Sequence, residues 1–307
     1  MQTSLALAMR RISKGWQLYV LILLPLVYLI VFRYVPMYGA QIAFKKFVLT
    51  KGIWESDWVG LRHFKRFWNT PGFWSILRNT LWLSLYQLIV SFPCPILLAL
   101  GLNYVRGRTF KRTVQMVTYA PHFISVVVVA GITMQMLAPR TGAVNNVLAL
   151  LGFERINFMG EPGYFMSIFV WSDVWQNIGF GCIVYLAALA GIDPTLHEAA
   201  MIDGASKRQR MLNIDLPGIM PVAMIILILN MGHILDLGFE KALLLQNPLN
   251  IGTSEIIDTY VYKIGLQSQV PNFDYAAAIG LFKNGIAFVL LLTANKLAKT
   301  FTRSSLW

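Results

Sequence analysis

Long apolar runs separated by shorter polar segments recur along the chain from Trp16 to Ala298. A helix needs about 20 mostly apolar residues to cross the hydrocarbon core of a bilayer. By that measure the pattern predicts an all-α membrane protein with six spanning helices. The predicted spans cover residues 16–34, 79–105, 113–137, 166–190, 219–236 and 276–298.

The composition agrees with a membrane protein. Hydrophobic residues make up 56% of the 307 residues and charged residues only 13%, whereas soluble domains carry about 25% charged residues. The two cysteines, Cys94 and Cys182, lie inside apolar runs, so they form neither a disulfide framework nor a zinc pattern. The net charge of +12 is typical of loop cations that set membrane topology, and we expect no nucleic-acid partner.

The distribution of lysine and arginine predicts that both termini are cytoplasmic, because cations concentrate in cytoplasmic loops. Arginines and lysines fall before the first span, in the loop 104–112, in the loop 193–217 and in the tail. The first span is long and lacks a convincing cleavage site, which favours an uncleaved anchor. We therefore expect a cytoplasmic N-terminus at 1–15, one transmembrane domain at 16–300 and a cytoplasmic tail at 301–307.

The predicted first outer loop, residues 35–78, departs from this charge rule. It carries seven cations against Glu55 and Asp57. Such a loop attracts an anionic substrate or an acidic patch on a docking protein, and it equally suits contact with lipid headgroups. The residues alone leave these three interpretations open.

The loop that follows the fourth span contains a distinctive segment, DPTLHEAAMIDGASKRQRMLNIDLPGIMP, which begins at Asp193. Asp193 suits an N-cap and Pro194 the first helical turn. Gly204 permits a sharp reorientation because it has no Cβ to forbid a positive φ. We expect a second, basic helical stretch after it, closed by Pro217 before the fifth span. The pattern predicts a helix-turn-helix elbow on the cytoplasmic face.

This elbow resembles the EAA signature of binding-protein-dependent ABC importers: Glu198-Ala199-Ala200, three residues, Gly204, nine residues, Ile214, one residue and Leu216-Pro217. The resemblance implies the permease fold of a type I importer and identifies the elbow as the coupling helix that contacts a separate ATPase. The coupling residues it implies are Glu198, Ala199, Ala200, Asp203, Gly204, Ile214, Leu216 and Pro217.

Further segments resemble the carbohydrate branch of this family, among them RYVPMYGAQIAFKKF, GFEKALLLQNPLN and TSEIIDTYVYKIGLQ. They are most similar to permeases for oligosaccharides released from complex polysaccharides, alginate and rhamnogalacturonan systems included. The resemblance implies an oligosaccharide substrate of undecided charge, and it implies partners: a second permease subunit, two ATPase subunits and an extracytoplasmic solute-binding protein.

No G-x-x-x-x-G-K-[ST] phosphate loop occurs in the sequence. Such a loop needs its lysine on the phosphates and its hydroxyl on magnesium, so we expect ATP and Mg²⁺ to be bound by the partner ATPase. H-E-x-x-H and G-x-S-x-G are absent too, and the four histidines are scattered. We expect no catalytic residue, metal site or cofactor in this chain.

Polar residues inside the predicted spans suggest a substrate pathway, because ionisable groups at membrane depth are expensive and face cavities or partners. Helical geometry places Asp173 and Lys283 about 10 Å from the outer ends of their spans. His233, counted from the inner end of the fifth span, falls at roughly the same depth in a hydrocarbon core of about 30 Å. We therefore expect these three residues to line one wall of a substrate chamber. The other candidate residues are Gln176 and Asn177 beside Asp173, Asn230 beside His233, Asn284 beside Lys283, and Trp175 and Tyr185 as flat surfaces for sugar rings.

Each of these residues also has a purely structural interpretation. Polar side chains join transmembrane helices by hydrogen bonds, and aromatic residues pack helices or form interfacial belts. For the whole chain, the alternatives are an ion-coupled secondary transporter, a membrane enzyme, and an ABC permease for peptides or amino acids. The first leaves the elbow unexplained, the second lacks catalytic motifs, and only the carbohydrate-like segments argue against the third.

Overall fold

The computed structural model describes residues 15–302, so the predicted terminal segments 1–15 and 301–307 lie almost entirely outside the described residues. The chain divides into two compact units. The first comprises residues 15–67 and Ile264–Leu281, and the second comprises Trp68–Lys263 and the chain from residue 282 onward. Each unit is described by itself.

The first unit begins with the first predicted span. Helix α2 (Trp16–Leu29) continues through a π-helical turn (Ile30–Tyr34), α3 (Val35–Met37) and a 3-10 helix (Tyr38–Phe44). No residue of α2 is buried, as expected of apolar side chains that face lipid. A two-stranded antiparallel hairpin follows, β1 (Lys45–Val48) and β2 (Gly52–Trp58), then α4 (Arg62–Trp68).

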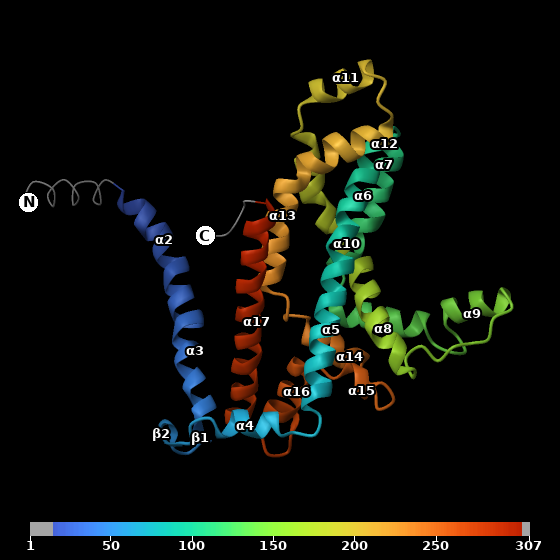
Figure 1. Ribbon diagram of the computed structural model, residues 1–307. Helices are drawn as coiled ribbons and strands as arrows, with labels where there is room; N and C mark the ends of the chain where they lie inside the picture. Colours follow the sequence, from blue (N-terminus) through green and yellow to red (C-terminus); the bar gives the residue numbers. More distant parts are fainter. Residues whose placement is uncertain (1–14, 303–307) are drawn as a thin grey trace, which may run out of the picture. The chain divides into compact units, whose positions relative to one another are not determined.

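The second unit holds most of the remaining spans (Figure 1). Helices α5 (Phe73–Ser91) and α6 (Pro93–Tyr104) form one long apolar segment. Helix α10 (Phe165–Ala190) is the fourth predicted span and α13 (Leu216–Gly232) the fifth. Helix α17 (Phe273–Thr302) is the sixth, and it runs from the first unit into the second. Within residues 15–302, five helices are long and apolar enough to cross a membrane.

The third predicted span is not straight. Helix α7 (Arg108–Tyr119) leads into a 3-10 helix (Ala120–Phe123), and α8 (Val126–Met136) departs at an angle of 109°. Ser125 starts α8 as an N-cap whose hydroxyl accepts a hydrogen bond from the Val128 N–H. Pro121 lies in the 3-10 segment, where a missing N–H is tolerated. The bent pair counts as the sixth span only if both arms are taken together.

Helix α10 organises the core of the second unit. At one end Phe165, Phe169 and Val174 pack with residues of α5, α8 and α14 (Phe239–Leu245). At the other end Cys182 and Leu189 pack with residues of α6 and α13. The exposed side chains of α10, Trp171 and Phe180 among them, are apolar as well. This accounts for its weak amphipathic character, because a spanning helix meets either the bundle or lipid on every side.

The elbow lies at one end of the second unit, opposite α15 (Ile251–Ser254) and α16 (Ile257–Tyr262) (Figure 1). It consists of α11 (Pro194–Ile202) and α12 (Lys207–Arg210). The prediction that Pro217 closes the basic stretch is wrong, because residues Lys207–Gly232 run on as one helix. A π-helical turn at Met211–Asp215 precedes the proline, and Pro217 occupies the first turn of α13, where it disrupts no hydrogen bond.

Several short helical elements between the spans were not predicted from the hydropathy pattern. Helix α9 (Ala143–Leu150) follows α8, and a 3-10 turn (Pro162–Tyr164) leads into α10. A π-helical turn (Lys263–Gln267) follows α16. These elements and α14 to α16 occupy stretches between spans that are too short or too polar to cross a membrane.

Gly179 provides a test of the packing around α10. A Cβ built there would lie 2.1 Å from the Thr118 carbonyl oxygen of α7, so Gly179→Ala must force the two helices apart. We expect a loss of about 1–3 kcal/mol in unfolding free energy and a lower melting midpoint in detergent. Gly131→Ala in α8 is the control, because its Cβ meets nothing within 4 Å and alanine favours a helix. Equal midpoints for the two variants would contradict the close contact.

Candidate functional site

The elbow is built by local capping chemistry. The Asp193 carboxylate accepts a hydrogen bond from the Thr195 N–H, and this bond holds the pKa of the Asp193 carboxyl below its usual value. Gly204 has a φ of +77°, in the left-handed region that favours glycine. Ser206 and Gln209 then form a reciprocal capping box at the start of α12. The predicted helix, turn and basic helix are all present.

No residue of α11 is buried. Glu198, Ala199, Asp203 and Gly204 are exposed, and Ala200 is half-buried. Leu196, Met201 and Ile202 are exposed as well, Ile202 by 87%. The helix therefore presents an uncovered surface with three large apolar side chains, a combination typical of protein interaction sites. Of the later coupling residues, Ile214 and Leu216 are half-buried and Pro217 is exposed.

A buried carboxylate ties the elbow to the spans. Asp215, in the π-helical turn before α13, is 0% exposed. It accepts a hydrogen bond from the Tyr104 hydroxyl at the end of α6 (2.5 Å), and the His197 Nε2 of α11 lies 3.2 Å from its other oxygen. One side chain thus connects three elements. Neither Asp215 nor His197 was singled out from the sequence, because the signature leaves both positions free.

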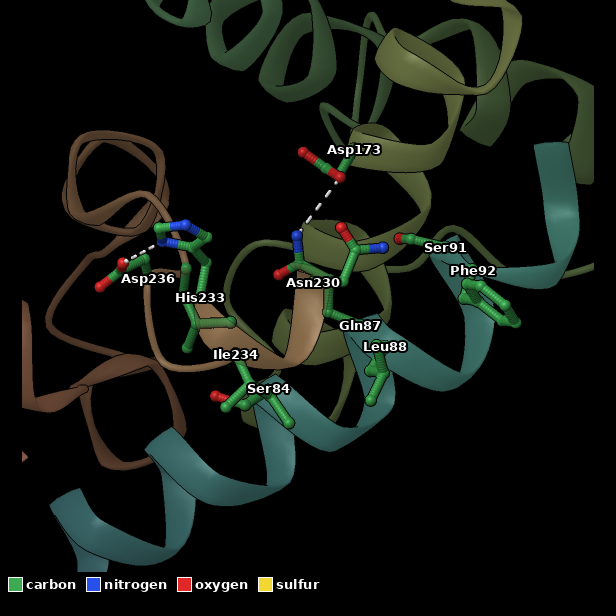
Figure 2. Close-up of a pocket in the computed structure, with 11 residues that line it drawn as sticks. Ser84, Gln87, Leu88, Ser91, Phe92, Asp173, Asn230, His233, Ile234 and Asp236 are labelled. Atoms are coloured by element: carbon green, nitrogen blue, oxygen red, sulfur yellow. Dashed lines mark hydrogen bonds and ion pairs between the residues drawn. The ribbon is translucent and has the colours of Figure 1, made fainter. Parts of the chain in front are cut away.

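A cavity of about 280 Å³ lies among α5, α10 and the end of α13 (Figure 2). Asp173 and His233, two of the three residues that the depth argument grouped, line it together with Asn230. Lys283, the third, is not among its lining residues. His233 stands just after the last residue of α13, and its side chain is largely exposed. The remaining polar lining comes from Ser84, Gln87, Ser91 and Asp236.

Asp173 is held in place from several sides. The Gln87 amide nitrogen donates to its Oδ2 (3.3 Å) and the Asn177 amide nitrogen to its Oδ1 (3.1 Å). The ammonium of Lys241, on α14, lies 3.6 Å from Oδ1 and is almost fully buried. Asp173 therefore compensates a buried cation as well as lining the cavity.

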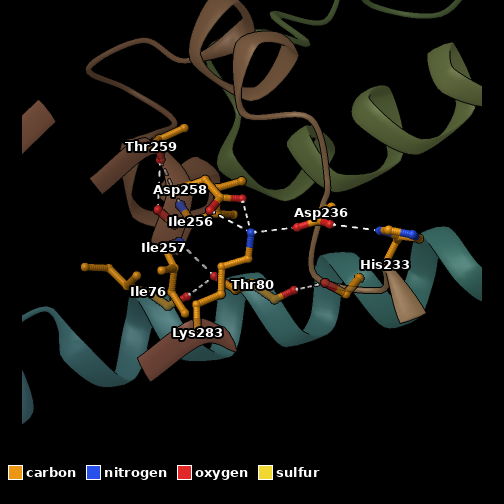
Figure 3. A network of polar contacts seen from close by, with 10 residues as sticks. Ile76, Thr80, His233, Asp236, Ile256, Ile257, Asp258, Thr259 and Lys283 are labelled. Atoms are coloured by element: carbon orange, nitrogen blue, oxygen red, sulfur yellow. Dashed lines mark hydrogen bonds and ion pairs between the residues drawn. The ribbon is translucent and has the colours of Figure 1, made fainter. Parts of the chain in front are cut away.

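Lys283 joins the chamber wall through a charge network (Figure 3). Its Nζ donates to both oxygens of Asp258, on α16, at 2.8 and 2.9 Å, and to Asp236 at 3.1 Å. Asp236 in turn lies 3.2 Å from the His233 Nδ1. One buried ammonium thus connects α17, α16 and the segment after α13. His233 and Lys283, which were predicted to lie at a similar depth, are connected in the structure through Asp236.

The other predicted pathway residues are placed differently. Gln176 donates to the Ile124 carbonyl at 2.9 Å, across the bend between α7 and α8, and Asn177 also contacts the His122 ring nitrogen at 2.9 Å. Trp175 lines a separate apolar groove with Trp171. Tyr185 is buried in the core and lines a second cavity, together with Asp173, Asn177 and Asn230. Asn284 is exposed and lines none of these cavities.

Sequence reasoning missed Gln87, Asp236, Lys241 and Asp258. The last two lie on α14 and α16, in a stretch that hydropathy treats as a connecting loop. A usable signal was present, because Lys241, Asp258 and Lys283 supply opposite charges next to apolar runs, and buried charges need partners.

The chain is similar to known transport proteins over most of its length. The model of a family described as binding-protein-dependent transport system inner membrane component matches residues 91–303. Protein LplB of Bacillus subtilis (strain 168) is 40% identical over 97% of this chain and 93% of its own length. From the same organism, the polygalacturonan/rhamnogalacturonan transport system permease protein YteP is 42% identical over 94% of this chain and 90% of its own length.

Two solved structures are similar throughout. One is a bacterial ABC transporter involved in the import of the acidic polysaccharide alginate, with a TM-score of 0.87 and 39% identity over 95% of this chain and 98% of that chain. The other is a bacterial alginate ABC transporter in complex with an alginate pentasaccharide-bound periplasmic protein. Its TM-score is 0.88 and its identity 38%, over 97% of this chain and 99% of that chain.

The Lys283 network predicts a specific stability pattern. Lys283→Met leaves Asp236 and Asp258 without their cation, and breaking a buried pair in this way costs about 3–5 kcal/mol. We expect the lower end of that range, because Asp236 is largely exposed. A second substitution, Asp258→Leu, removes the carboxylate that was left without a cation. The double variant should therefore recover part of the lost unfolding free energy. Thermal unfolding in detergent measures both variants, and a double variant less stable than Lys283→Met would contradict the network.

Proposed function

Because this chain belongs to the family of binding-protein-dependent transport system inner membrane components, we propose that it forms half of the translocation pathway of an ATP-driven oligosaccharide importer. The uncovered elbow at α11 carries this proposal, because it is the surface through which a permease without its own phosphate loop receives the work of ATP hydrolysis. The family match includes the elbow. An ion-coupled transporter has no need of such an element.

The substrate class follows from the relatives. YteP is described as a polygalacturonan and rhamnogalacturonan permease, and the similar solved transporters import alginate. We propose that this chain also passes an oligosaccharide derived from a complex polysaccharide. The polar groups around the cavity suit this ligand, because Asn230, Gln87 and Asp236 accept or donate hydrogen bonds to hydroxyls.

The coupling partner is a separate ATPase that binds ATP and Mg²⁺. Leu196, Met201 and Ile202 are the apolar part of its contact surface on α11, and Glu198 and Asp203 lie exposed beside them. Asp215 then transmits displacement of α11 to the ends of α6 and α13, since it contacts His197 and Tyr104 directly. A buried carboxylate that is hydrogen-bonded to Tyr104 and lies against His197 resists separation of the elements that it joins.

The assembly we propose contains a second permease subunit, two ATPases and an extracytoplasmic solute-binding protein. The family name implies the binding protein, and one similar structure contains a periplasmic protein loaded with alginate pentasaccharide. We place the elbow on the cytoplasmic side of a bacterial inner membrane. The basic residues of α12 lie at the same end of the second unit as those at the start of α7 (Figure 1), as the charge rule for cytoplasmic loops requires.

Substitution of Asn230 tests whether the cavity that it lines is the substrate chamber. Asn230 is exposed in the cavity, so Asn230→Ala should lower oligosaccharide uptake by reconstituted complexes while assembly stays intact. A lost hydrogen bond to substrate is worth about 0.5–1.5 kcal/mol, which corresponds to a reduction of roughly two- to tenfold. Asn284→Ala is the matched control, because Asn284 is exposed outside the cavity. Equal uptake by the two variants would place the chamber elsewhere. Asp173→Ala is a poorer test, because it also leaves the buried Lys241 ammonium without its carboxylate partner.

Gly204 tests the coupling elbow. A valine at its φ of +77° adds strain of roughly 1–2 kcal/mol and thickens the surface beside α11. Gly204→Val should insert normally and yet lose uptake, either with loss of the ATPase subunits or with ATP hydrolysis that loaded binding protein no longer stimulates. Gly152→Val is the control, since Gly152 has a φ of +84° and open space around it. If both variants lose coupling alike, backbone strain alone accounts for the loss and the elbow has no special role. If both couple like the unaltered protein, the elbow is not the coupling element.

A further inference from the structure

The first unit contains a cavity that shares no lining residue with the candidate chamber. Its volume is about 470 Å³, and its walls come from β1, α4 and the start of α17. All of its lining residues belong to the first unit. They include three of the seven cations that made the predicted outer loop unusually basic: Lys46, Arg62 and Arg66.

The cations that line the cavity make contacts different from those of Lys45, the residue next to Lys46 in the sequence. Lys45 is buried, and its ammonium donates to the Ile53 and Trp54 carbonyls of β2, so it serves the hairpin. Lys46 and Arg62 are exposed at the cavity, and none of the ion pairs found within residues 15–302 involves either of them. The Arg66 guanidinium lies over the Tyr275 ring, 4.3 Å from its centre, which holds that third cation at the cavity wall.

The single carboxylate of the cavity, Asp274, is already engaged. Its Oδ2 accepts a hydrogen bond from the Phe47 N–H (3.0 Å), and its Oδ1 accepts one from the Tyr275 N–H (2.8 Å). The ring of His63 lies 3.5 Å from Oδ2. Asp274 thereby fastens β1 to the start of α17 and offsets one of the three cations, so the cavity keeps an excess of positive charge.

His63 forms part of the inner wall of the cavity. Its side chain is 9% exposed, and its Nε2 lies 3.1 Å from the Lys45 carbonyl oxygen. Its Nδ1 is shielded from solvent and has no hydrogen-bond partner, so the ring shapes the wall and contacts no ligand through that atom. The same wall includes the first residues of α17, a 30-residue helix, and the N-terminus of a helix favours anions.

The surroundings of the cavity are those of a membrane interface. Helix α2 exposes apolar side chains along its length. Leu49, Trp54 and Trp58 of the hairpin are exposed as well, and tryptophan concentrates at the level of lipid headgroups. Cations beside exposed apolar groups match an amphipathic ligand, which has an anionic head and hydrocarbon tails.

We propose that this cavity binds the phosphate of an anionic phospholipid headgroup. Lys46 and Arg62 pair with the phosphate, and the His63 ring and the start of α17 supply the inner wall. With the orientation given above, the lipid belongs to the extracytoplasmic leaflet. The site holds lipid and not the transported sugar, and it explains why this loop is basic on the side where the charge rule predicts few cations.

The test is a lipid titration of the delipidated, purified complex, followed by native mass spectrometry. Phosphatidylglycerol is compared with phosphatidylcholine that carries the same acyl chains. Each cation beside an anionic headgroup contributes roughly a fivefold gain in affinity, so Lys46→Gln with Arg62→Gln should weaken phosphatidylglycerol binding by at least about tenfold. Phosphatidylcholine binding should be unchanged.

Lys51→Gln with Lys65→Gln is the matched control. It removes the same charge from exposed positions of the same segment that do not line the cavity, and it should leave phosphatidylglycerol binding within about twofold. If both double variants lose affinity equally, binding is diffuse attraction and the site does not exist. If glycerol phosphate or a uronic acid oligosaccharide displaces the lipid at equal concentration, the cavity takes a soluble anion and the lipid assignment falls. Retention of acidic binding protein that depends on Lys46 and Arg62, with lipid binding unaffected, would likewise overturn the proposal.

Discussion

Hydrocarbon cannot solvate a charge or an unpaired amide, so each ionisable group at membrane depth must find its partner inside the protein. In this chain the requirement is met by a few contacts that join distant elements. Lys283 pairs with Asp258 and Asp236, and Lys241 lies against Asp173. Each pair links a spanning helix to a short helix or segment that hydropathy alone assigns to a loop. The spans are thereby held in register by charge as well as by apolar packing.

The same contacts determine how the candidate chamber is formed. Asp173 and Asp236 balance buried ammonium groups and also expose oxygen atoms to the cavity. These two residues therefore both neutralise a buried cation and face the cavity, whereas Asn230 lines the cavity and neutralises no cation. A polar cavity can persist among apolar helices because its charged walls are already neutralised. Movement of α13 or α17 would change the cavity by altering contacts that both helices share through Asp236.

Backbone irregularities place the other key side chains. The π-helical turn at Met211–Asp215 lets one helix continue past Pro217 and directs Asp215 inward, toward Tyr104 and His197. Such turns are rare and are found frequently at functional sites. The bend between α7 and α8 similarly brings His122 and the Ile124 carbonyl to Asn177 and Gln176 of α10. Polar residues that a helical projection assigns to a pathway thus include some that hold a bend in place.

The sequence by itself determined the membrane class, the approximate limits of the spans, the elbow and the positive φ of Gly204. These features depend on local properties, namely apolar length, capping residues and the absence of a Cβ, and local properties are legible in a linear pattern. Only the tertiary structure decided the hairpin at residues 45–58, the 109° bend, the partners of Lys283 and the anchoring of α11 by Asp215. Those features depend on which residues meet across separations of 4 to more than 100 positions, and helical periodicity carries no information about such contacts.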